Sequence, residues 1–395
     1  MNRWPIKSLG ELITTLESGS RPKGGVSEIP DGIPSLGGEH INRDGGFVWE
    51  TAKHVTREFY LRMKRGRIQQ GDILVVKDGA TTGKTAVVRD NFPFREAAIN
   101  EHVFLLRTDK YKILPEFVGY FLFSPLGQQQ ILSNFRGAAI GGIAQDFVRN
   151  VHVPVPPLVE QERIVKLLGE ADELRKLRTQ ADRRSVDLIP ALFHEMFGDP
   201  INNIKRWPKI PLAEVGKLDR GRSKNRPRDD ASLYGGKYPF IQTGDVAKSN
   251  GLITSYTQTY SERGLAQSRM WPTGTLCITI AANIGKTAIL TFPACFPDSL
   301  VGFVPDNKVI IDYVRQWLVT MESSLKEAAP QMAQKNINLK ILGELLIPIP
   351  PLPLQQEFAQ RVTEIREMEA EQAKSKTRLD ALFQSLLHRA FEGEL

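Results

Sequence analysis

The sequence predicts an α+β protein with two mixed α/β domains, each followed by a long helix, in a pseudo-twofold repeat. Three observations lead to this fold class. The chain has 395 residues, about twice the usual domain size of roughly 100 to 200 residues. Its second half repeats an ordered series of motifs from its first half. Near the end of each half, apolar residues recur at helical spacing over a long stretch.

Motifs in the same order in both halves carry the repeat. The matched pairs are Trp4-Pro5 with Trp207-Pro208, Gly83-Lys84-Thr85-Ala86 with Gly285-Lys286-Thr287-Ala288, the proline-rich hinge Val153 to Leu158 with Ile347 to Leu352, and Ala191-Leu192-Phe193 with Ala381-Leu382-Phe383. The offset drifts from 203 to 190 along the chain, as small insertions would cause. We therefore expect one duplication with divergence rather than a short-period solenoid.

Each copy divides at its hinge, which predicts domains at 1–157 and 201–352 and helical regions at 158–200 and 353–395. Before the hinge, runs at 72–76, 86–88 and 102–106 are β-branched or aromatic and lie between Gly, Pro, Asn and Asp clusters, which is typical of strands. Helices are expected there at 115–123, 127–135 and 310–328.

After each hinge, the apolar spacing predicts one long amphipathic helix. Pro157 and Pro351 suit the first turn of a helix, whereas Pro190 should bend or interrupt the first helix near its end. Some 35 residues extend about 50 Å at 1.5 Å per residue, too far for a small core to cover. We expect the two long helices to cover each other as an antiparallel coiled coil, which would hold the two domains apart like a caliper.

Composition excludes several classes of protein. Hydrophobic residues make up 41% and charged residues 25% of the chain, which is typical of a soluble globular protein. We expect the two cysteines, Cys277 and Cys295, to pack in the core of a cytoplasmic protein. No apolar stretch approaches the roughly 20 residues that span a bilayer, so no membrane association is expected.

The net charge of +7 is unevenly distributed. The two long segments carry +4 and +7, and each short helical region carries −2. A polyanion partner should therefore meet the long segments. Basic residues in their turn-rich stretches are the candidate DNA contacts, namely Arg21, Lys23, Lys64, Arg65, Arg67 and Lys84 in the first copy and Arg220, Arg222, Lys224, Arg226, Arg228 and Lys286 in the second. A solvated loop is an equally good interpretation for any single one of them.

Catalytic and cofactor motifs are not found. The run from Gly79 to Thr85 resembles a phosphate-binding loop, but Asp78 stands where its first glycine would be needed, and the second copy has Ile280 there. A strand–turn–strand element is the better interpretation. The double prolines at the hinges lack the aromatic residue of an amino-methyltransferase loop. The six histidines show no metal spacing, so no cofactor and no metal are expected.

The ordered motifs resemble the specificity subunit of Type I restriction-modification systems over essentially the whole chain. The resemblance rests on the Trp-Pro starts, the two Gly-Lys-Thr-Ala runs, the hinges with Glu160-Gln161-Glu162 and Gln355-Gln356-Glu357, and the C-terminal run 386–395. The first copy departs from that ending with Phe197-Gly198-Asp199-Pro200, which we interpret as the junction into the second domain.

The resemblance implies a non-catalytic subunit with two target-recognition domains. It would bind a bipartite, asymmetric site in double-stranded DNA and direct modification (methyltransferase) and restriction (translocase and nuclease) subunits to it. Candidates for contact with these partners follow the hinges, namely Gln161, Arg163, Gln356 and Arg361. The alternative is a helical scaffold protein that assembles partners without binding DNA.

Overall fold

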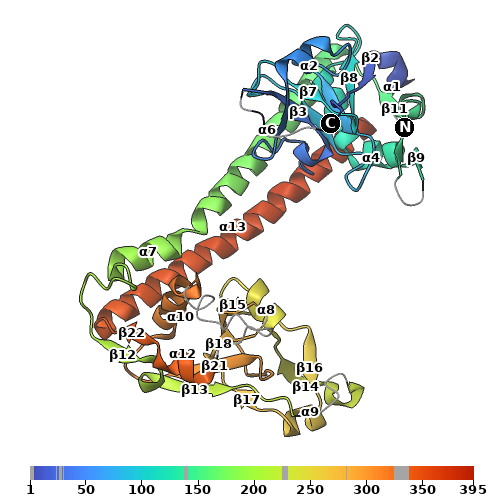
Figure 1. Ribbon diagram of the computed structural model, residues 1–395. Coiled ribbons are helices and arrows are strands. Elements are labelled where there is room, and N and C mark those ends of the chain that lie inside the picture. Colours follow the sequence, from blue (N-terminus) through green and yellow to red (C-terminus); the bar gives the residue numbers. More distant parts are fainter. Residues whose placement is uncertain are drawn as a thin grey trace. The chain divides into compact units, whose positions relative to one another are not determined.

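The computed structural model describes residues 4–23, 25, 29, 31–137, 141–224, 230–281, 283–323 and 338–395. The chain forms two compact units (Figure 1). Unit 1 comprises Met1–Gln180 with Ala373–Leu395, and unit 2 comprises Ala181–Gln372. The last part of the chain thus returns to the first unit, so each unit contains pieces of both helical regions.

Two sheets form the frame of unit 1. The larger is antiparallel with the order β2–β8–β5–β6, in which the strands are Ile13–Ser18, Val103–Thr108, Ile73–Val76 and Thr85–Val87. The smaller has the order β4–β3–β7, with strands Lys53–Val55, Ile33–Leu36 and Ala98–Ile99. Two short pairs complete the unit, β1 (Ile6–Ser8) with β11 (His152–Pro154) and β9 (Phe135–Arg136) with β10 (Gly142–Ile143). The β1–β11 pair joins the start of the domain to its hinge.

Short helices connect these strands. They are α1 (Leu9–Leu12), η1 (Gly38–His40), α2 (Arg57–Arg62), α3 (Pro115–Phe123), α4 (Pro125–Leu132) and α5 (Phe147–Asn150). Helix α3 has the expected bounds. Helix α4 begins two residues before the expected start at Gly127, because the Ser124 hydroxyl caps it by accepting from the Gly127 N–H at 3.1 Å and Pro125 fits its first turn. It ends at Leu132, so Phe135 lies in β9 instead.

Unit 2 repeats this frame and extends it. Its larger sheet has the order β13–β21–β18–β19–β15, with strands Gly216–Arg220, Leu300–Pro305, Leu276–Thr279, Thr287–Leu290 and Leu252–Ile253. Its second sheet has the order β16–β14–β20–β17, with strands Gln258–Tyr260, Tyr234–Phe240, Ala294–Cys295 and Met270–Trp271. The β12 (Lys209–Pro211) and β22 (Leu346–Pro348) pair again joins domain start and hinge. Strands β15 and β17 are the additions to the first unit's pattern.

The helices of unit 2 follow the same order. They are η2 (Leu212–Glu214), η3 (Ala231–Leu233), α8 (Thr243–Lys248), α9 (Glu262–Ala266), α10 (Ile311–Thr320) and α12 (Leu339–Glu344). The helix expected at 310–328 is α10 over its first half, and part of the remainder lies outside the described residues. Cys277 and Cys295 are buried and free, as expected for packing residues.

Both helical regions begin directly after their hinges. Helix α6 covers Leu158–Ser185, and α7 covers Leu188–Phe197 after a break at Val186 and Asp187. The interruption expected from Pro190 therefore falls a few residues before it, and the proline lies in the first turn of α7, where its missing N–H costs little. Helix α13 runs without a break over Leu352–Glu392.

Each unit buries parts of both helical regions in its core. In unit 1, Ile164 and Leu168 of α6 and Phe383, Leu387 and Phe391 of α13 join one cluster with α3. The Phe391 ring lies edge-on to Phe117 and Phe121 of α3 at 5.3 Å. In unit 2, Phe193 and Phe197 of α7 meet Phe358 of α13 and Tyr313 of α10. A large part of each core therefore depends on a helix from the other half of the sequence.

The two Gly-Lys-Thr-Ala runs form antiparallel strand–turn–strand elements, as expected. In unit 1 the Gly83 N–H donates to the Val76 carbonyl at 2.8 Å, and in unit 2 the Gly285 N–H donates to Thr279 at 3.0 Å. Both glycines have a positive φ, +88° and +85°, which other residues rarely adopt. The run that resembles a phosphate-binding loop in the sequence is therefore part of a strand–turn–strand element. Among the described residues, no helix is both long and apolar enough to cross a membrane.

Candidate nucleic-acid interface

Two equivalent loops leave the larger sheets at the same point of the frame. Strand β2 leads to Gly19 and strand β13 to Gly221. A Cβ at Gly19 would lie 1.9 Å from the Ile99 carbonyl oxygen, and a Cβ at Gly221 would lie 2.3 Å from that of Pro297. No side chain fits at either position, so glycine lets each loop pass close to a neighbouring stretch of backbone, at Ile99 of β7 in unit 1 and at Pro297, between β20 and β21, in unit 2. The candidate DNA contacts of both loops follow within a few residues.

In unit 1 this loop carries Arg21 and Lys23. Both side chains are exposed, and the Arg21 guanidinium pairs with Glu101 at 2.5 Å. His102 continues this cluster, because its Nδ1 lies 2.5 Å from Asp78 and its Nε2 lies 3.5 Å from Glu101. Arginine, histidine and two carboxylates therefore form one half-exposed polar group beside β7. Sequence reasoning singled out Arg21 and missed the others, because they are far apart in the chain.

The second basic group of unit 1 serves two different purposes. Lys64 and Arg65 are exposed, and neither forms an ion pair with the described part of the chain. Arg67 is partly buried, and its guanidinium donates to the carbonyls of Tyr60 and Leu61 at 3.1 and 2.6 Å. These carbonyls are at the C-terminal end of α2, where the helix leaves acceptors incompletely satisfied, although the Tyr60 carbonyl also accepts from the Met63 N–H at 3.1 Å. The structure thus gives Arg67 a capping role, while Lys64 and Arg65 remain available to a polyanion.

The paired lysines Lys84 and Lys286 are both held by their own unit. The Lys84 amine donates to the Ile41 carbonyl at 2.9 Å, and the Lys286 amine pairs with Glu322 at 3.0 Å. Each bond ties the strand–turn–strand element to a neighbouring segment. Their recurrence in the sequence therefore has a structural reason, and DNA contact by either lysine stays a prediction.

The basic loop of unit 2 begins at the end of β13. Backbone bonds fix it, since the Arg222 N–H donates to the Phe296 carbonyl at 3.0 Å and the Ser268 hydroxyl donates to the Arg222 carbonyl at 2.8 Å. The side chains of Arg220, Arg222 and Lys224 are exposed. Arg226 and Arg228 lie outside the described residues. A fixed backbone with free cationic ends is the arrangement that suits contact with phosphates.

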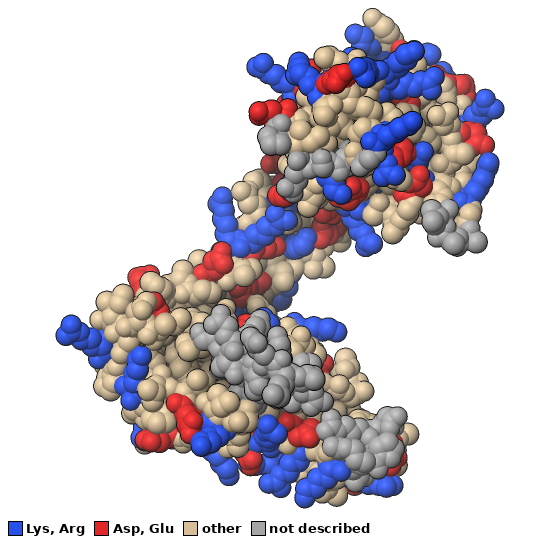
Figure 2. Space-filling view, in the orientation of Figure 1, with Lys and Arg blue, Asp and Glu red and all other residues tan. Residues whose placement is uncertain are grey.

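Charge alone does not outline a candidate DNA-binding surface. Figure 2 shows Lys and Arg side chains over the visible face of each unit with Asp and Glu between them, rather than one continuous basic field. Many of the cations are paired locally, such as Arg57 with Glu96 and Lys237 with Glu262. The described residues contain no group of three or more His, Cys, Asp or Glu that could hold a metal ion.

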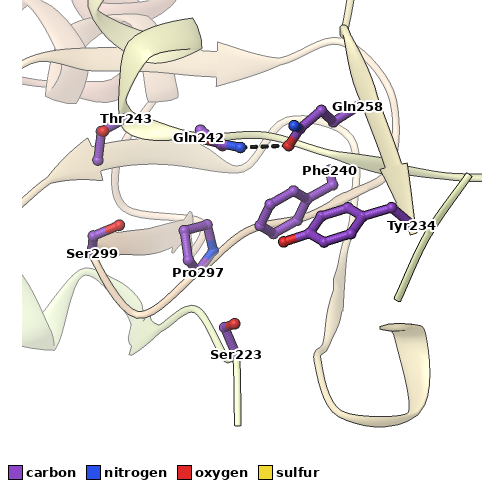
Figure 3. Close-up of a pocket in the computed structure, with 8 residues that line it drawn as sticks. All are labelled: Ser223, Tyr234, Phe240, Gln242, Thr243, Gln258, Pro297 and Ser299. Atoms are coloured by element: carbon purple, nitrogen blue, oxygen red, sulfur yellow. Dashed lines mark hydrogen bonds between the residues drawn. The ribbon is translucent and has the colours of Figure 1, made fainter. Parts of the chain in front are cut away.

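A hollow of about 500 Å³ lies beside the basic loop of unit 2 (Figure 3). Eight residues line it, namely Ser223, Tyr234, Phe240, Gln242, Thr243, Gln258, Pro297 and Ser299. The Gln242 and Gln258 amides are hydrogen-bonded to each other at its edge, and the rings of Tyr234 and Phe240 lie below them in the view of Figure 3. The sequence did not predict this site, because its residues come from four separate segments of the chain.

The residues proposed for partner contact lie in two different environments. Arg163, Gln356 and Arg361 are exposed, and the two arginines pair with Glu160 and Glu357 on their own helices at 2.7 and 2.6 Å. Gln161 is fully buried. Its amide accepts from the Leu114 N–H at 2.8 Å and donates to the carbonyls of Lys112 and Pro156 at 3.1 and 2.8 Å. We therefore correct its assignment from partner contact to a hinge residue.

The structural counterpart of Gln161 is Gln355, one residue before the glutamine that the motif comparison had paired with it. Gln355 is also fully buried. It accepts from the Ile310 N–H at 2.9 Å and donates to the carbonyls of Lys308 and Pro350 at 3.3 and 2.8 Å. The same three bonds thus tie the hinge to the globular domain in both units.

Comparisons with known proteins agree on one family. The family model described as "Type I restriction modification DNA specificity domain" matches residues 1–182 and 204–379. The putative type I restriction enzyme MjaX specificity subunit of Methanocaldococcus jannaschii is 22% identical, over 99% of this chain and 93% of that protein. The EcoDI specificity subunit of Escherichia coli is 24% identical, over 68% of this chain and 67% of that protein.

Two solved structures share the fold. A chain from a study of complex assembly and conformational transition of the type I R-M system has a TM-score of 0.65 at 21% identity, over 99% of this chain and 98% of that one. The type I restriction-modification S subunit from M. genitalium has a TM-score of 0.59 at 17% identity, over 99% and 96%. With one matched region in each half, the chain belongs to the family of Type I restriction modification DNA specificity domains.

Proposed function

We propose that this chain is the specificity subunit of a Type I restriction-modification complex and that each unit reads one half of a bipartite, asymmetric DNA site. One observation carries the proposal beyond family membership. The two units share one frame of strands and hinges, but the equivalent loops place their cations differently. Arg21 and Lys23 lie two and four residues after Gly19 in unit 1, where Arg21 pairs with Glu101, whereas Arg222 and Lys224 lie one and three residues after Gly221 in unit 2. A common frame with differently placed cations suits two different half-sites.

The chain itself has a recognition role and no catalytic one. Methyl transfer and DNA cleavage belong to separate modification and restriction subunits, which this chain directs to the site. The description of the matched family, a DNA specificity domain, supports this division of labour. The exposed Arg163, Gln356 and Arg361 are our candidates for contact with these partners. Cytoplasmic localisation follows from the proposal, since the DNA target is there.

The long helices set the distance between the half-sites as an antiparallel coiled coil. Contacts within each unit support this part of the proposal. In unit 2, Ser185 meets Gln372 while Phe193, further along the chain, meets Phe358, earlier in α13. In unit 1, the Arg175 guanidinium binds Asp380 at 2.7 Å and lies over the Phe383 ring at 4.5 Å. Contacts that move forward along one helix while they move back along the other are typical of antiparallel helices.

A helical scaffold that binds no DNA is the alternative, and the matched family argues against it. A DNA-binding assay at several salt concentrations, with and without the co-expressed modification subunits, separates the two. We expect a complex that binds one bipartite duplex more tightly than a scrambled duplex, with an affinity that falls as salt rises. Assembly with the modification subunits but equal affinity for both duplexes would leave only the scaffold.

A further inference from the structure

The hollow of unit 2 has the chemistry of a nucleobase site. Its floor contains the Tyr234 and Phe240 rings, and its edge contains the two amides of Gln242 and Gln258 (Figure 3). Aromatic rings and amides are the groups with which proteins contact base faces and base edges. Ser223, on the opposite side of the hollow in Figure 3, lies between the exposed Arg222 and Lys224. A strand held by this basic loop would therefore bring its bases toward the hollow.

The amide pair restricts which base fits. One hydrogen bond joins Gln242 and Gln258, with the Gln242 amide as donor and the Gln258 carbonyl oxygen as acceptor. Gln242 keeps its carbonyl oxygen and Gln258 keeps its NH₂ group for a ligand. Reversing both amides exchanges these roles and still leaves one acceptor beside one donor. The donor–acceptor pattern of the edge is therefore the same in both orientations.

Adenine has the complementary pattern. In the major groove it offers the N6 amine as a donor next to N7 as an acceptor. Guanine offers two acceptors, O6 and N7, and would leave the free glutamine oxygen facing another oxygen. Cytosine offers only a donor, and thymine offers an acceptor beside a methyl group. Each of these bases leaves one group of the amide pair without a partner.

The same positions in unit 1 hold different residues. The second sheets of the two units have an equivalent strand pair. Lys53 lies opposite Ser35 of β3 in unit 1, and Gln258 lies opposite Phe240 of β14 in unit 2. Gly37 precedes η1 as Gln242 precedes α8. The backbone N–H of each donates to the side chain of the third residue of its helix, His40 or Asp245, at 2.8 Å in both cases. A glycine and a lysine cannot form an amide pair. Unit 1 therefore lacks this device on an otherwise equivalent frame.

We propose that Gln242 and Gln258 read an adenine in the half-site of unit 2. This inference rests on the proposed function and deepens it, because it assigns a base and a site to one unit. The adenine is read within the duplex, through N6 and N7 in the major groove, because there its donor beside an acceptor distinguishes it from the other three bases.

The test uses the full chain co-expressed with its modification subunits, and the methylated motif is found by sequencing methylated DNA. Gln242→Leu and Gln258→Leu should each accept other base pairs at one A·T position of one half-site. Affinity for the original duplex should fall roughly 5- to 150-fold, which corresponds to about 1–3 kcal/mol at 1.4 kcal/mol per tenfold. Gln145→Leu, at an exposed glutamine of unit 1, is the matched control and should leave the motif unchanged.

A charge variant gives a change of specificity that does not depend on lost stability. In Gln258→Glu the carboxylate still accepts the bond from Gln242, and the edge then presents acceptors only. We expect this variant to prefer cytosine at the same position, because the cytosine N4 amine donates. In the wild-type complex, 7-deazaadenine at this position should weaken binding if the adenine is read in the duplex through N7. Unchanged affinity for the 7-deazaadenine duplex would contradict reading through N7.

The possible failures are distinguishable. If the wild-type complex methylates no bipartite motif, the proposed function is wrong. A second outcome is a bipartite wild-type motif that all three variants of Gln242 and Gln258, assembled with their partners, still methylate. In that case the adenine site is wrong and the proposed function stands. Relaxed specificity at a G·C position would also overturn the assignment of adenine.

Discussion

The hinge glutamines give a stability prediction that can be worked out bond by bond. Replacing Gln355 by leucine keeps an apolar side chain of similar size but removes three hydrogen bonds, to Ile310, Lys308 and Pro350. Gln355 is fully buried, so leucine leaves these backbone groups without their partner, and the bond to Pro350 is itself buried. Each such bond contributes about 1 kcal/mol, and more where its partner stays buried and unsatisfied. We therefore expect Gln355→Leu to lower the free energy of unfolding of unit 2 by about 3 kcal/mol.

Thermal unfolding followed by calorimetry measures this loss. For a unit of about 200 residues, 1 kcal/mol shifts the midpoint by about 2–4 °C. We therefore expect the unit 2 transition to fall by about 6–12 °C. Gln161→Leu should do the same to unit 1, since Gln161 forms the equivalent three bonds.

The neighbouring residue supplies the control. Gln356 is exposed beside Gln355, so Gln356→Leu should stay within about 0.5 kcal/mol of the wild type. If Gln355→Leu shifts the transition no more than Gln356→Leu does, the hinge bonds do not stabilise the unit and this reasoning is refuted.

Three further predictions follow from the loops and the long helices. One heptad can be inserted into each long helix, between Leu174 and Ala181 and between Ile365 and Gln372. Seven residues at 1.5 Å each should move the domains apart by about 10 Å. The gap between the two DNA half-sites should then grow by about three base pairs at 3.4 Å each. A folded, active variant with an unchanged gap would contradict the caliper. Replacing Arg222 and Lys224 by alanine should weaken binding to cognate and scrambled duplexes alike and reduce the slope of log affinity against log salt by about 0.9 for each lost phosphate contact; an unchanged slope would place the DNA elsewhere. Burial raises the pKa of Asp380, but hydrogen bonds from Arg175 and Lys376 outweigh burial and lower the pKa overall. The contribution of Asp380 to the stability of unit 1 is therefore present above the unfolded pKa near 4 and is lost as the pH falls through the folded pKa. Asp380→Asn should therefore lower the free energy of unfolding of unit 1 by up to about 1 kcal/mol at pH 7. Urea unfolding should also show a weaker dependence of this free energy on pH between about pH 5 and 3.

The repeat made much of the fold predictable. Motifs such as Gly83-Lys84 and Gly285-Lys286 mark the same turn twice, and the positive φ of both glycines explains why the residue type recurs. The apolar spacing after each hinge predicted α6 and α13, although it could not show that Phe391 would pack on α3. That contact joins residues far apart in sequence, and local periodicity has no information about it.

The candidate site was less predictable, for a physical reason. A basic residue in a turn-rich stretch has the same sequence pattern whether it faces DNA or binds its own backbone. Arg67 caps α2, and Lys84 and Lys286 tie down their turns. The Gln242–Gln258 pair and the Asp78–His102–Glu101 group form only when separate segments of the chain meet. Gln161 and Gln355 occupy the same position in their two hinges. Aligning the hinges residue by residue, with no shift between them, would have paired these two glutamines.

The central claim is that each unit reads its own half of the DNA site. The most direct test replaces residues 1–150 by the equivalent domain of a relative with a different target, co-expresses the hybrid with its modification subunits and sequences the methylated DNA. We predict that one half of the motif changes to that of the relative while the other half stays as in the wild type. A hybrid that assembles and methylates DNA, but changes both halves or neither, would contradict the claim.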